Sequence, residues 1–338
     1  DLGQAAPGAG GLAGQVFDAD LVLVSTGIKP EVGLAKAAGV VLGPTGAISV
    51  TPSMETSIKD IYACGDCIEQ YHLITGKPVW RPLGSTANKT GRIAGDVASG
   101  GDLAFRGILG TGIFRVFDLA VAMTGLTERE ALAEGYDVEV SHNIKVDRPD
   151  DMGGKEMTIK ALADRSTGKL LGAQIIGYDG VDKRIDVFVT LLTYGAVAED
   201  LFHLDLAYSP PFSISKDPIM YTGMILDNAI SKGRKLILPK ELDNVRESGL
   251  KVQIIDTRVP SQYEADHLDA AISIPHEKVR EVIEKDNLLD KEALTVTYCN
   301  KGVTGNAVQN ILIGKGFKNV ANLSGGHKSY RKTKRQPK

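Results

Sequence analysis

The sequence of 338 residues is long enough for two or three domains, since most domains contain about 100–150 residues. It is 43% hydrophobic and 24% charged, which is ordinary for a folded soluble protein, and its net charge of −3 excludes a nucleic-acid-binding surface over the whole molecule. There is no run of 18 apolar residues, so we expect no membrane-spanning helix. The three cysteines suit a reducing cytoplasm, and the basic residues 331–338 are interpreted as a frayed terminus.

The N-terminal segment contains a glycine-rich stretch, GAGGLA at residues 8–13, that nearly matches a dinucleotide-binding motif. That motif needs a strand before it and a helix after it, and neither is predicted, so we interpret the stretch as a hairpin connection. The first predicted strand is ADLVLVS at residues 19–25, only a short loop from a first residue that is not methionine. We therefore expect a portion of a longer protein that enters in the middle of a domain.

The next segment carries TGIKPE at residues 26–31 and the strand end IYACGD at residues 61–66. This series resembles the pyridine nucleotide-disulfide oxidoreductases, which are flavoenzymes. The resemblance implies that Gly65 lets the backbone approach FAD closely and that Asp66 accepts a hydrogen bond from a hydroxyl of the flavin chain. Cys64 and Cys67 have C-x-x-C spacing, but no second pair completes a zinc site. We interpret both cysteines as packing residues and expect no metal site.

Residues 81–95, RPLGSTANKTGRIAG, combine small residues with a helical pattern. They resemble the family helix whose N-terminus faces the isoalloxazine ring, which implies that Thr86 and Ala87 lie at that contact. Amides and the helix dipole would there stabilise negative charge on reduced flavin. We assign residues 1–104 to truncated Rossmann-type NAD(P)- and FAD-binding regions. The family's redox cysteine and glycine-rich motifs are not found in this sequence, so the chain alone is expected to lack reductase activity with NAD(P)H.

Residues 105–232 resemble the α+β dimerisation domain of the same family, through GTGIFRVF at 110–117, TGLT at 124–127 and LLGAQIIG at 170–177. Alternation at residues 155–161 predicts a half-buried strand, residues 164–169 a hairpin turn, and residues 183–195 a helix. The resemblance implies an antiparallel sheet and a homodimer.

The segment DLAYSPPFSISKDP at residues 205–218 contains three prolines and is predicted to be stiff and non-helical. It resembles the coenzyme A-disulfide reductase and NADH oxidase branch, in which this segment crosses the dimer interface. The resemblance implies that Tyr208 offers a hydroxyl near the redox cysteine of the other subunit. A purely structural tyrosine at an interface is the equally weighted alternative.

Residues 233–244 are interpreted as a linker, and a predicted strand then leads into Cys299 in TVTYC at residues 295–299. A glycine-containing loop and a helical pattern at residues 306–315 follow. Loop amides and the helix N-terminus would direct partial positive charge at the sulfur, and Lys301 could add a full charge, which favours a reactive thiolate. A buried structural cysteine is the alternative.

The blocks around Cys299 resemble an α/β rhodanese domain, assigned to residues 245–338: VQIIDTR at 252–258, QYEADHL at 262–268, AAISIP at 270–275, GFKNV at 316–320 and LSGG at 323–326. In that family the loop cysteine carries a persulfide, and Asp256 and Arg258 would pair structurally near the loop. Many members have arginine where this chain has Thr304, which weakens the expectation of anionic donors such as thiosulfate. The implied cradle consists of Asn300, Lys301, Gly302, Val303 and Thr304.

The order of these regions implies an FAD-containing, NAD(P)H-dependent reductase of persulfides, polysulfides or coenzyme A-disulfide with a sulfur-carrying rhodanese domain. Coenzyme A and a small sulfur compound are the implied partners, without nucleic acid or membrane. Two alternatives stay open: a stand-alone rhodanese sulfurtransferase on a dimeric scaffold, and a non-catalytic rhodanese-like binding module.

Overall fold

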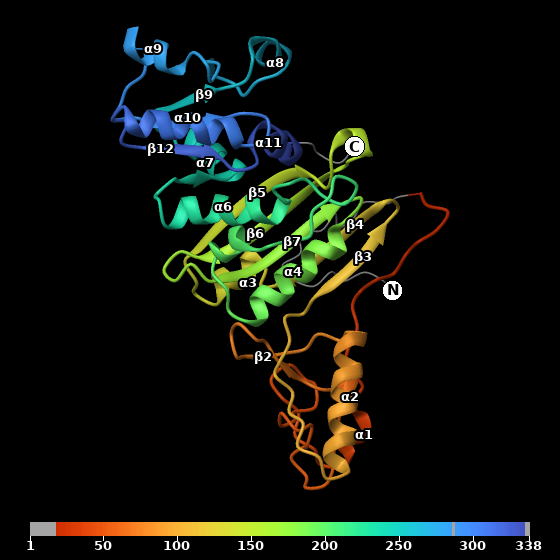
Figure 1. Ribbon diagram of the computed structural model, residues 1–338. Coiled ribbons are helices and arrows are strands. Elements are labelled where there is room, and N and C mark those ends of the chain that lie inside the picture. The colour runs from red at the N-terminus through yellow and green to blue at the C-terminus, as the bar shows by residue number, and fades with distance from the viewer. Residues whose placement is uncertain (1–17, 286–287, 335–338) are drawn as a thin grey trace.

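A computed structural model describes residues 18–285 and 288–334, so the glycine-rich stretch at residues 8–13 lies outside the described residues. Three parts follow one another along the chain: a loop-rich N-terminal part, a central part with an antiparallel sheet, and a C-terminal part with a parallel sheet (Figure 1). The central part lies between the other two. Within the described ranges, every helix is too short or too polar to cross a membrane.

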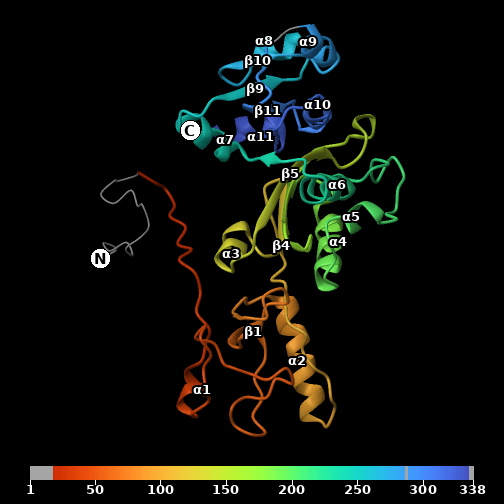
Figure 2. The same ribbon diagram turned by 90° about the vertical axis from the view of Figure 1, so that its left-hand side faces the viewer.

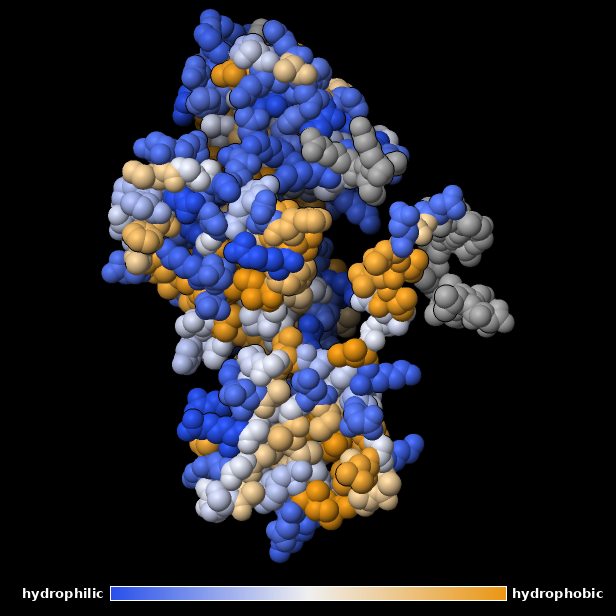
Figure 3. Space-filling view, turned by 90° about the vertical axis from the view of Figure 1, so that its right-hand side faces the viewer, coloured by the Kyte–Doolittle hydropathy of each residue, from blue (hydrophilic) through white to orange (hydrophobic). Residues whose placement is uncertain are grey.

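The N-terminal part has one long helix and little other regular structure. The predicted strand at residues 19–25 is wrong, because residues 21–24 are unpaired and 73–84% exposed. No described strand lies beside them to pair with their backbone groups. Figure 3 shows an apolar cluster standing off the body next to the grey atoms. The elements of this part are α1 (Gly33–Ala37), η1 (Gly65–Cys67), β1 (Gln70–Tyr71), β2 (Pro78–Val79) and α2 (Gly84–Ala98).

The central part is a five-stranded antiparallel sheet with the order β3-β4-β7-β6-β5. The strand predicted at residues 155–161 lies within β6, the turn at 164–169 joins β6 to β7, and the helix predicted at 183–195 is α4. The elements are β3 (Gly112–Val116), β4 (Leu119–Gly125), α3 (Glu128–Ala133), β5 (Val138–Val146), η2 (Asp150–Met152), β6 (Glu156–Asp164), β7 (Leu170–Gly177), α4 (Val181–Thr193), α5 (Asp200–His203) and α6 (Pro218–Ile230).

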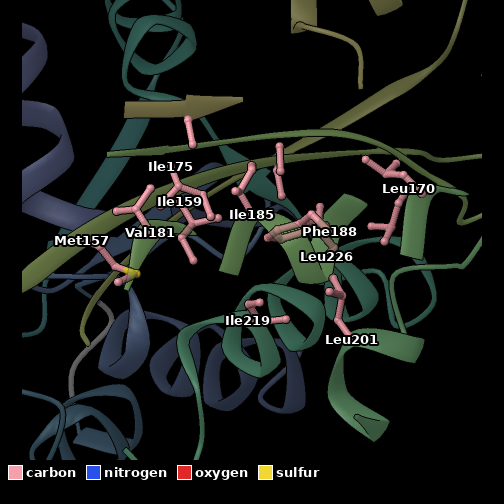
Figure 4. Packing of buried hydrophobic residues seen from close by; sticks show 14 of the residues in the cluster. Met157, Ile159, Leu170, Ile175, Val181, Ile185, Phe188, Leu201, Ile219 and Leu226 are labelled. Atoms are coloured by element: carbon pink, nitrogen blue, oxygen red, sulfur yellow. The ribbon is translucent and has the colours of Figure 1, made fainter. Parts of the chain in front are cut away.

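Each face of the central sheet has its own hydrophobic core. Helices α4, α5 and α6 cover one face and α3 the other (Figure 2). Phe188 of α4 and Leu226 of α6 are fully buried in the larger core, together with Ile159 and Ile175 of the sheet (Figure 4). Successive side chains of a strand point to opposite faces, so the neighbours Leu162 and Ala163 of β6 belong to opposite cores.

The C-terminal part is a parallel sheet with the order β10-β9-β11-β12-β8 and helices on both faces. Its strands β9 and β11 are almost completely buried, as expected for a parallel sheet covered on both sides. The elements are β8 (Leu236–Ile237), α7 (Pro239–Glu247), β9 (Val252–Asp256), α8 (Pro260–Ala265), β10 (Ala271–Ser273), α9 (Val279–Lys285), β11 (Leu294–Tyr298), α10 (Val303–Gly314), β12 (Val320–Leu323) and α11 (Gly326–Lys334).

Two segments expected to lie outside the folded domain belong to it. Residues 236–237, expected within a linker, form the edge strand β8 beside β12, and Leu242 of α7 is fully buried in the same core. The basic residues up to 334 continue α11, and Lys334 forms an ion pair of 2.8 Å with Asp243. Both segments are held by tertiary contacts that local sequence does not reveal.

The C-terminal part contacts the central part along β5 and β6. The backbone N–H of His142 in β5 donates to Ser324 Oγ at 2.8 Å. Glu156 at the start of β6 pairs with Lys301 at 2.5 Å and with Lys328 at 2.7 Å. Hydrogen bonds and ion pairs thus join the two parts directly.

This contact should weaken in acid because of His142. Burial, and secondarily Lys160, lowers its pKa from 6.5 to about 4, while Glu128 acts in the opposite direction. Between pH about 6.5 and about 4, His142 is therefore protonated in the unfolded chain but neutral in the folded chain. We expect the free energy of unfolding to fall by up to about 3 kcal/mol across this window.

Urea unfolding should be measured at pH 7.0, which lies above this window, and at pH 4.5, which lies inside it. His142→Gln should remove this part of the pH dependence while the remaining carboxylate contributions stay. Identical slopes of stability against pH in both proteins would contradict the prediction.

Candidate sulfur-transfer site

Cys299 lies directly after β11, a central strand of the parallel sheet with β9 on one side and β12 on the other. Strand ends at this edge of a parallel sheet are the usual position of ligand sites. The residue is only 6% exposed. The fold therefore places the thiol at the end of a rigid strand, in a recessed position.

The loop after Cys299 folds back over the sulfur. The backbone N–H of Gly302 donates to Cys299 Sγ at 3.2 Å. Gly302 has φ = +96°, a conformation that residues with a side chain rarely adopt, and α10 begins at the next residue. Asn322 of β12 donates from Nδ2 to the carbonyl of Gly302 at 3.0 Å and so holds the loop in this shape.

A second glycine makes room for the same loop. A Cβ at Gly326 would lie 2.3 Å from the carbonyl oxygen of Cys299, so only glycine fits at this position. The next residue, His327, donates its backbone N–H to that carbonyl at 2.8 Å. The start of α11 therefore fixes the backbone on which the thiol is mounted.

The other cradle residues are oriented away from the sulfur or toward their neighbours. Lys301 pairs with Glu156 of the central part rather than with the sulfur, contrary to the expectation that it charges the loop. Asn300 donates to Gln262 Oε1 at 3.0 Å. Thr304 lies 3.5 Å from the hydroxyl of Thr257, and the adjacent Val303 is half exposed.

Beneath the loop lies a buried polar network. Asp256 and Arg258 form an ion pair of 2.6 Å with side chains that are 0% and 4% exposed. Tyr298, the residue before Cys299, donates its hydroxyl to Asp256 Oδ2 at 2.6 Å. Burial first, and then Asp256, raise the pKa of Tyr298 above its usual value, so this hydroxyl remains a donor. Arg258 also donates to the carbonyl of Asp266 at 2.6 Å, which attaches the turn after α8 to the network.

That turn has a strained position. Ala270 has φ = +62°, although it carries a Cβ, which disfavours this left-handed conformation.

The candidate flavin-contacting residues gather at the start of α2. Gly65, with φ = +80°, lies against Ala87, and its N–H donates to Thr90 Oγ1 at 3.0 Å. Thr86 is buried in the first turn of the helix, and Asp66 is exposed beside it in η1. The N-terminus of α2, a helix of 15 residues, lies beside this glycine turn. Its partial positive charge suits a bound group that gains negative charge.

Tyr208 stands apart from these groups. It is 54% exposed, and no described hydrogen bond connects it to the Cys299 loop. Its segment is anchored by a pair that the sequence did not indicate, Arg184 of α4 and Asp217, which are nearly fully buried and 2.8 Å apart. The sequence also did not indicate that Lys145 and Glu156 belong to the site, because they approach the Cys299 loop from another part of the chain. A single arginine or lysine in a predicted element gives no signal of such a long-range partner.

Comparisons with known proteins agree with this architecture. Residues 113–218 match the pyridine nucleotide-disulphide oxidoreductase dimerisation domain, residues 238–333 the rhodanese-like domain, and residues 11–81 the pyridine nucleotide-disulphide oxidoreductase domain. The solved structure of reduced Bacillus anthracis CoADR-RHD superposes with a TM-score of 0.88 at 33% identity, covering 94% of this chain and 57% of that one. A NAD-dependent persulfide reductase from A. fulgidus superposes with a TM-score of 0.82 at 34% identity, covering 92% and 56%.

Curated relatives include the NAD(P)H sulfur oxidoreductase (CoA-dependent) of Pyrococcus furiosus, 44% identical over 63% of this chain and 48% of its own length. The coenzyme A disulfide reductase of Staphylococcus epidermidis is 31% identical over 62% and 48%. The chain spans about half the length of the curated relatives it matches.

The fold and the Cys299 loop define a rhodanese-like domain that follows a disulphide-oxidoreductase dimerisation domain in one chain. The chain thus contains regions that match pyridine nucleotide-disulphide oxidoreductase domains and, after them, a region that matches a rhodanese-like domain.

Proposed function

We propose that this chain is the dimerising and sulfur-carrying portion of an FAD- and NAD(P)H-dependent reductase of persulfides, polysulfides or coenzyme A-disulfide. The observation that carries the proposal is the geometry of Cys299, a recessed thiol at a strand end whose sulfur accepts the Gly302 amide at 3.2 Å. The Gly302 amide and the N-terminus of α10 place partial positive charge beside this sulfur. The names of the relatives support the same class of chemistry.

The step assigned to Cys299 is a sulfur exchange. Its thiolate attacks the terminal sulfur of a persulfide or polysulfide, a new S–S bond forms on Cys299, and the donor leaves as a thiolate shortened by one sulfur. Charge and electrons balance without an external oxidant. The persulfide remains anionic, so the Gly302 amide can stabilise the terminal sulfur as it stabilises the original thiolate.

The reductase side of the proposal concerns Gly65, Asp66, Thr86 and Ala87. Their glycine turn and helix N-terminus would hold FAD, which when bound supplies the electrons from NAD(P)H that reduce an S–S bond. The chain's own groups would position the cofactor and stabilise its negative charge through first-turn amides. Flavin-dependent reduction and sulfur loading within one polypeptide would raise the local concentration of the transferred sulfur.

A homodimer belongs to this proposal. The matched dimerisation domain exposes apolar side chains on the edge strand β3 and just after it, including Phe114 at 59% and Phe117 at 97%. Burial of such a row against a second copy would remove it from water. Tyr208, also exposed, would then be free to reach the partner's reaction centre. The three cysteines are unpaired, which suits a reducing compartment such as the cytoplasm.

The test is intact-protein mass spectrometry after brief exposure to a polysulfide donor, followed by peptide mapping. We expect the mass of one added sulfur atom on the peptide containing Cys299 and its loss on treatment with cyanide or a thiol. An unloaded Cys299 in folded protein would favour the non-catalytic binding module instead.

A further inference from the structure

A cavity of about 110 Å³ lies beside the Cys299 loop, between the central and C-terminal parts. One wall is formed by β5 and α6 of the central part. The other is formed by the loop residues Lys301, Gly302 and Val303 and by the end of β12. Gly302, whose amide contacts the sulfur, is one of the lining residues, whereas Cys299 lies behind it and does not line the cavity. The Cys299 loop is thus completed on this side by a different domain.

The cavity has apolar walls and a cationic character. Tyr221, Met224 and Ile225 from α6 supply apolar surface, and the lining contains three cations but no carboxylate. Two of the cations are already engaged: Lys301 pairs with Glu156, and Arg234 donates to the side chain of Asn310 and to the carbonyl of Lys232. The third cation is Lys145 of β5.

Lys145 forms no ion pair with a carboxylate of the described residues. Its Nζ lies 3.7 Å from the centroid of the Tyr221 ring instead. Burial lowers the pKa of Lys145, and Lys301 and Lys216 add to this effect, whereas a Cys299 thiolate opposes it. A partly buried cation beside a recessed thiol, without its own counter-charge, provides an electrostatic site for an anion.

We propose that this cavity binds a small dianion carrying a sulfane sulfur, and that Lys145 supplies the positive charge that Thr304 does not supply within the Cys299 loop. This inference rests on the proposed sulfur exchange at Cys299. With thiosulfate as donor, the Cys299 thiolate forms an S–S bond to the outer sulfur and sulfite leaves, so that three negative charges stand on each side of the exchange.

Size and surface chemistry define the ligand class. A water needs about 10–15 Å³ of comparable space, so the cavity admits several heavy atoms. It is well below the roughly 300–1,000 Å³ of pockets that hold drug-sized molecules, which excludes a nucleotide. Polarisable sulfur packs favourably against an aromatic ring and a thioether, here Tyr221 and Met224. A short polysulfide or thiosulfate combines these properties with the negative charge that Lys145 attracts.

The direct test measures thiosulfate binding to the full chain by calorimetry in a Cys299→Ser background, where no sulfur can be transferred. We expect Lys145→Met to weaken binding about tenfold and Lys145→Arg to restore it to within about threefold. Lys216→Met is the matched control, because its Nζ also lies near the Tyr221 ring, at 5.3 Å, but it does not line the cavity. It should change binding less than about twofold.

A second measurement uses the intact Cys299 and follows its persulfidation rate against thiosulfate concentration. Lys145→Met should raise the half-saturating concentration about tenfold and change the limiting rate much less. Equal behaviour of Lys145→Met and Lys216→Met, with Cys299 still loading, would overturn the cavity assignment alone. No binding in the Cys299→Ser background would also overturn it. Thiosulfate binding, with Cys299 loaded by neither thiosulfate nor a polysulfide donor, would instead refute the sulfur exchange.

Discussion

Replacing Cys299 by serine should lower sulfur loading of the protein by about a thousandfold or more, the scale on which loss of a catalytic nucleophile acts. A hydroxyl at this position cannot form the S–S bond on which the exchange depends. It also ionises far less readily than a thiol, so the amide of Gly302 has no anion to stabilise. The measurement is the rate of sulfur incorporation from a polysulfide donor, followed by mass spectrometry.

The other two cysteines provide the control. Cys64 is exposed and Cys67 is half-buried, and burial raises the pKa of the Cys67 thiol. Their double replacement by serine should leave sulfur incorporation nearly unchanged. The Cys299→Ser protein should fold normally, because Gly302, Asn322 and Gly326 still define the loop. Sulfur that accumulates on Cys64 or Cys67 at the wild-type rate would overturn the assignment of Cys299.

Asp256→Ala should give the largest loss of stability, about 3–5 kcal/mol. The carboxylate is fully buried and accepts from the Arg258 guanidinium and from the Tyr298 hydroxyl. Removing it leaves a buried guanidinium without its counter-charge and a buried hydroxyl without its acceptor. Urea unfolding followed by circular dichroism measures the loss, and hydrogen exchange in β9 and β11 locates it.

Two further variants identify the cause. The double variant Asp256→Ala with Arg258→Met should recover part of the loss, because it removes the unpaired buried charge. Glu292→Gln breaks the ion pair with Lys318, whose side chains are about two-thirds exposed, and should have little effect. If Asp256→Ala were no worse than Glu292→Gln, the buried network would not hold the Cys299 loop in place.

Whether an element could be predicted from the sequence depends on the range of the interactions that form it. The strand before Cys299, the glycine loop and the helix after it were predictable, because all three are encoded within about twenty consecutive residues. So were β6, its turn and α4, through local alternation and helical spacing. The strand predicted at residues 19–25 failed because a short apolar run forms a strand only when a neighbouring strand pairs with it.

The boundary between the second and third parts also depended on distant contacts. Residues 236–237 are too few to show a periodic pattern, and only their pairing with β12, more than 80 residues later, makes them a strand. A distant contact also changed the interpretation of Lys301, whose position in the loop had suggested that it places a positive charge beside the sulfur. The approach of Glu156 from β6 redirected it, and Lys145 took its place beside the loop.

By itself the sequence determined the position of the candidate cysteine between a strand and a helix, because short-range patterns of β-formers, glycines and helical spacing specify it. The order of the parts followed from the resemblance of each segment to a known family. Only the tertiary structure decided which charges surround that residue. Coulomb interactions act between groups that are close in space, and the fold brings β5 and β6 against a loop about 150 residues further along the chain. The sulfur site was therefore visible in one segment, whereas its electrostatic environment comes from two.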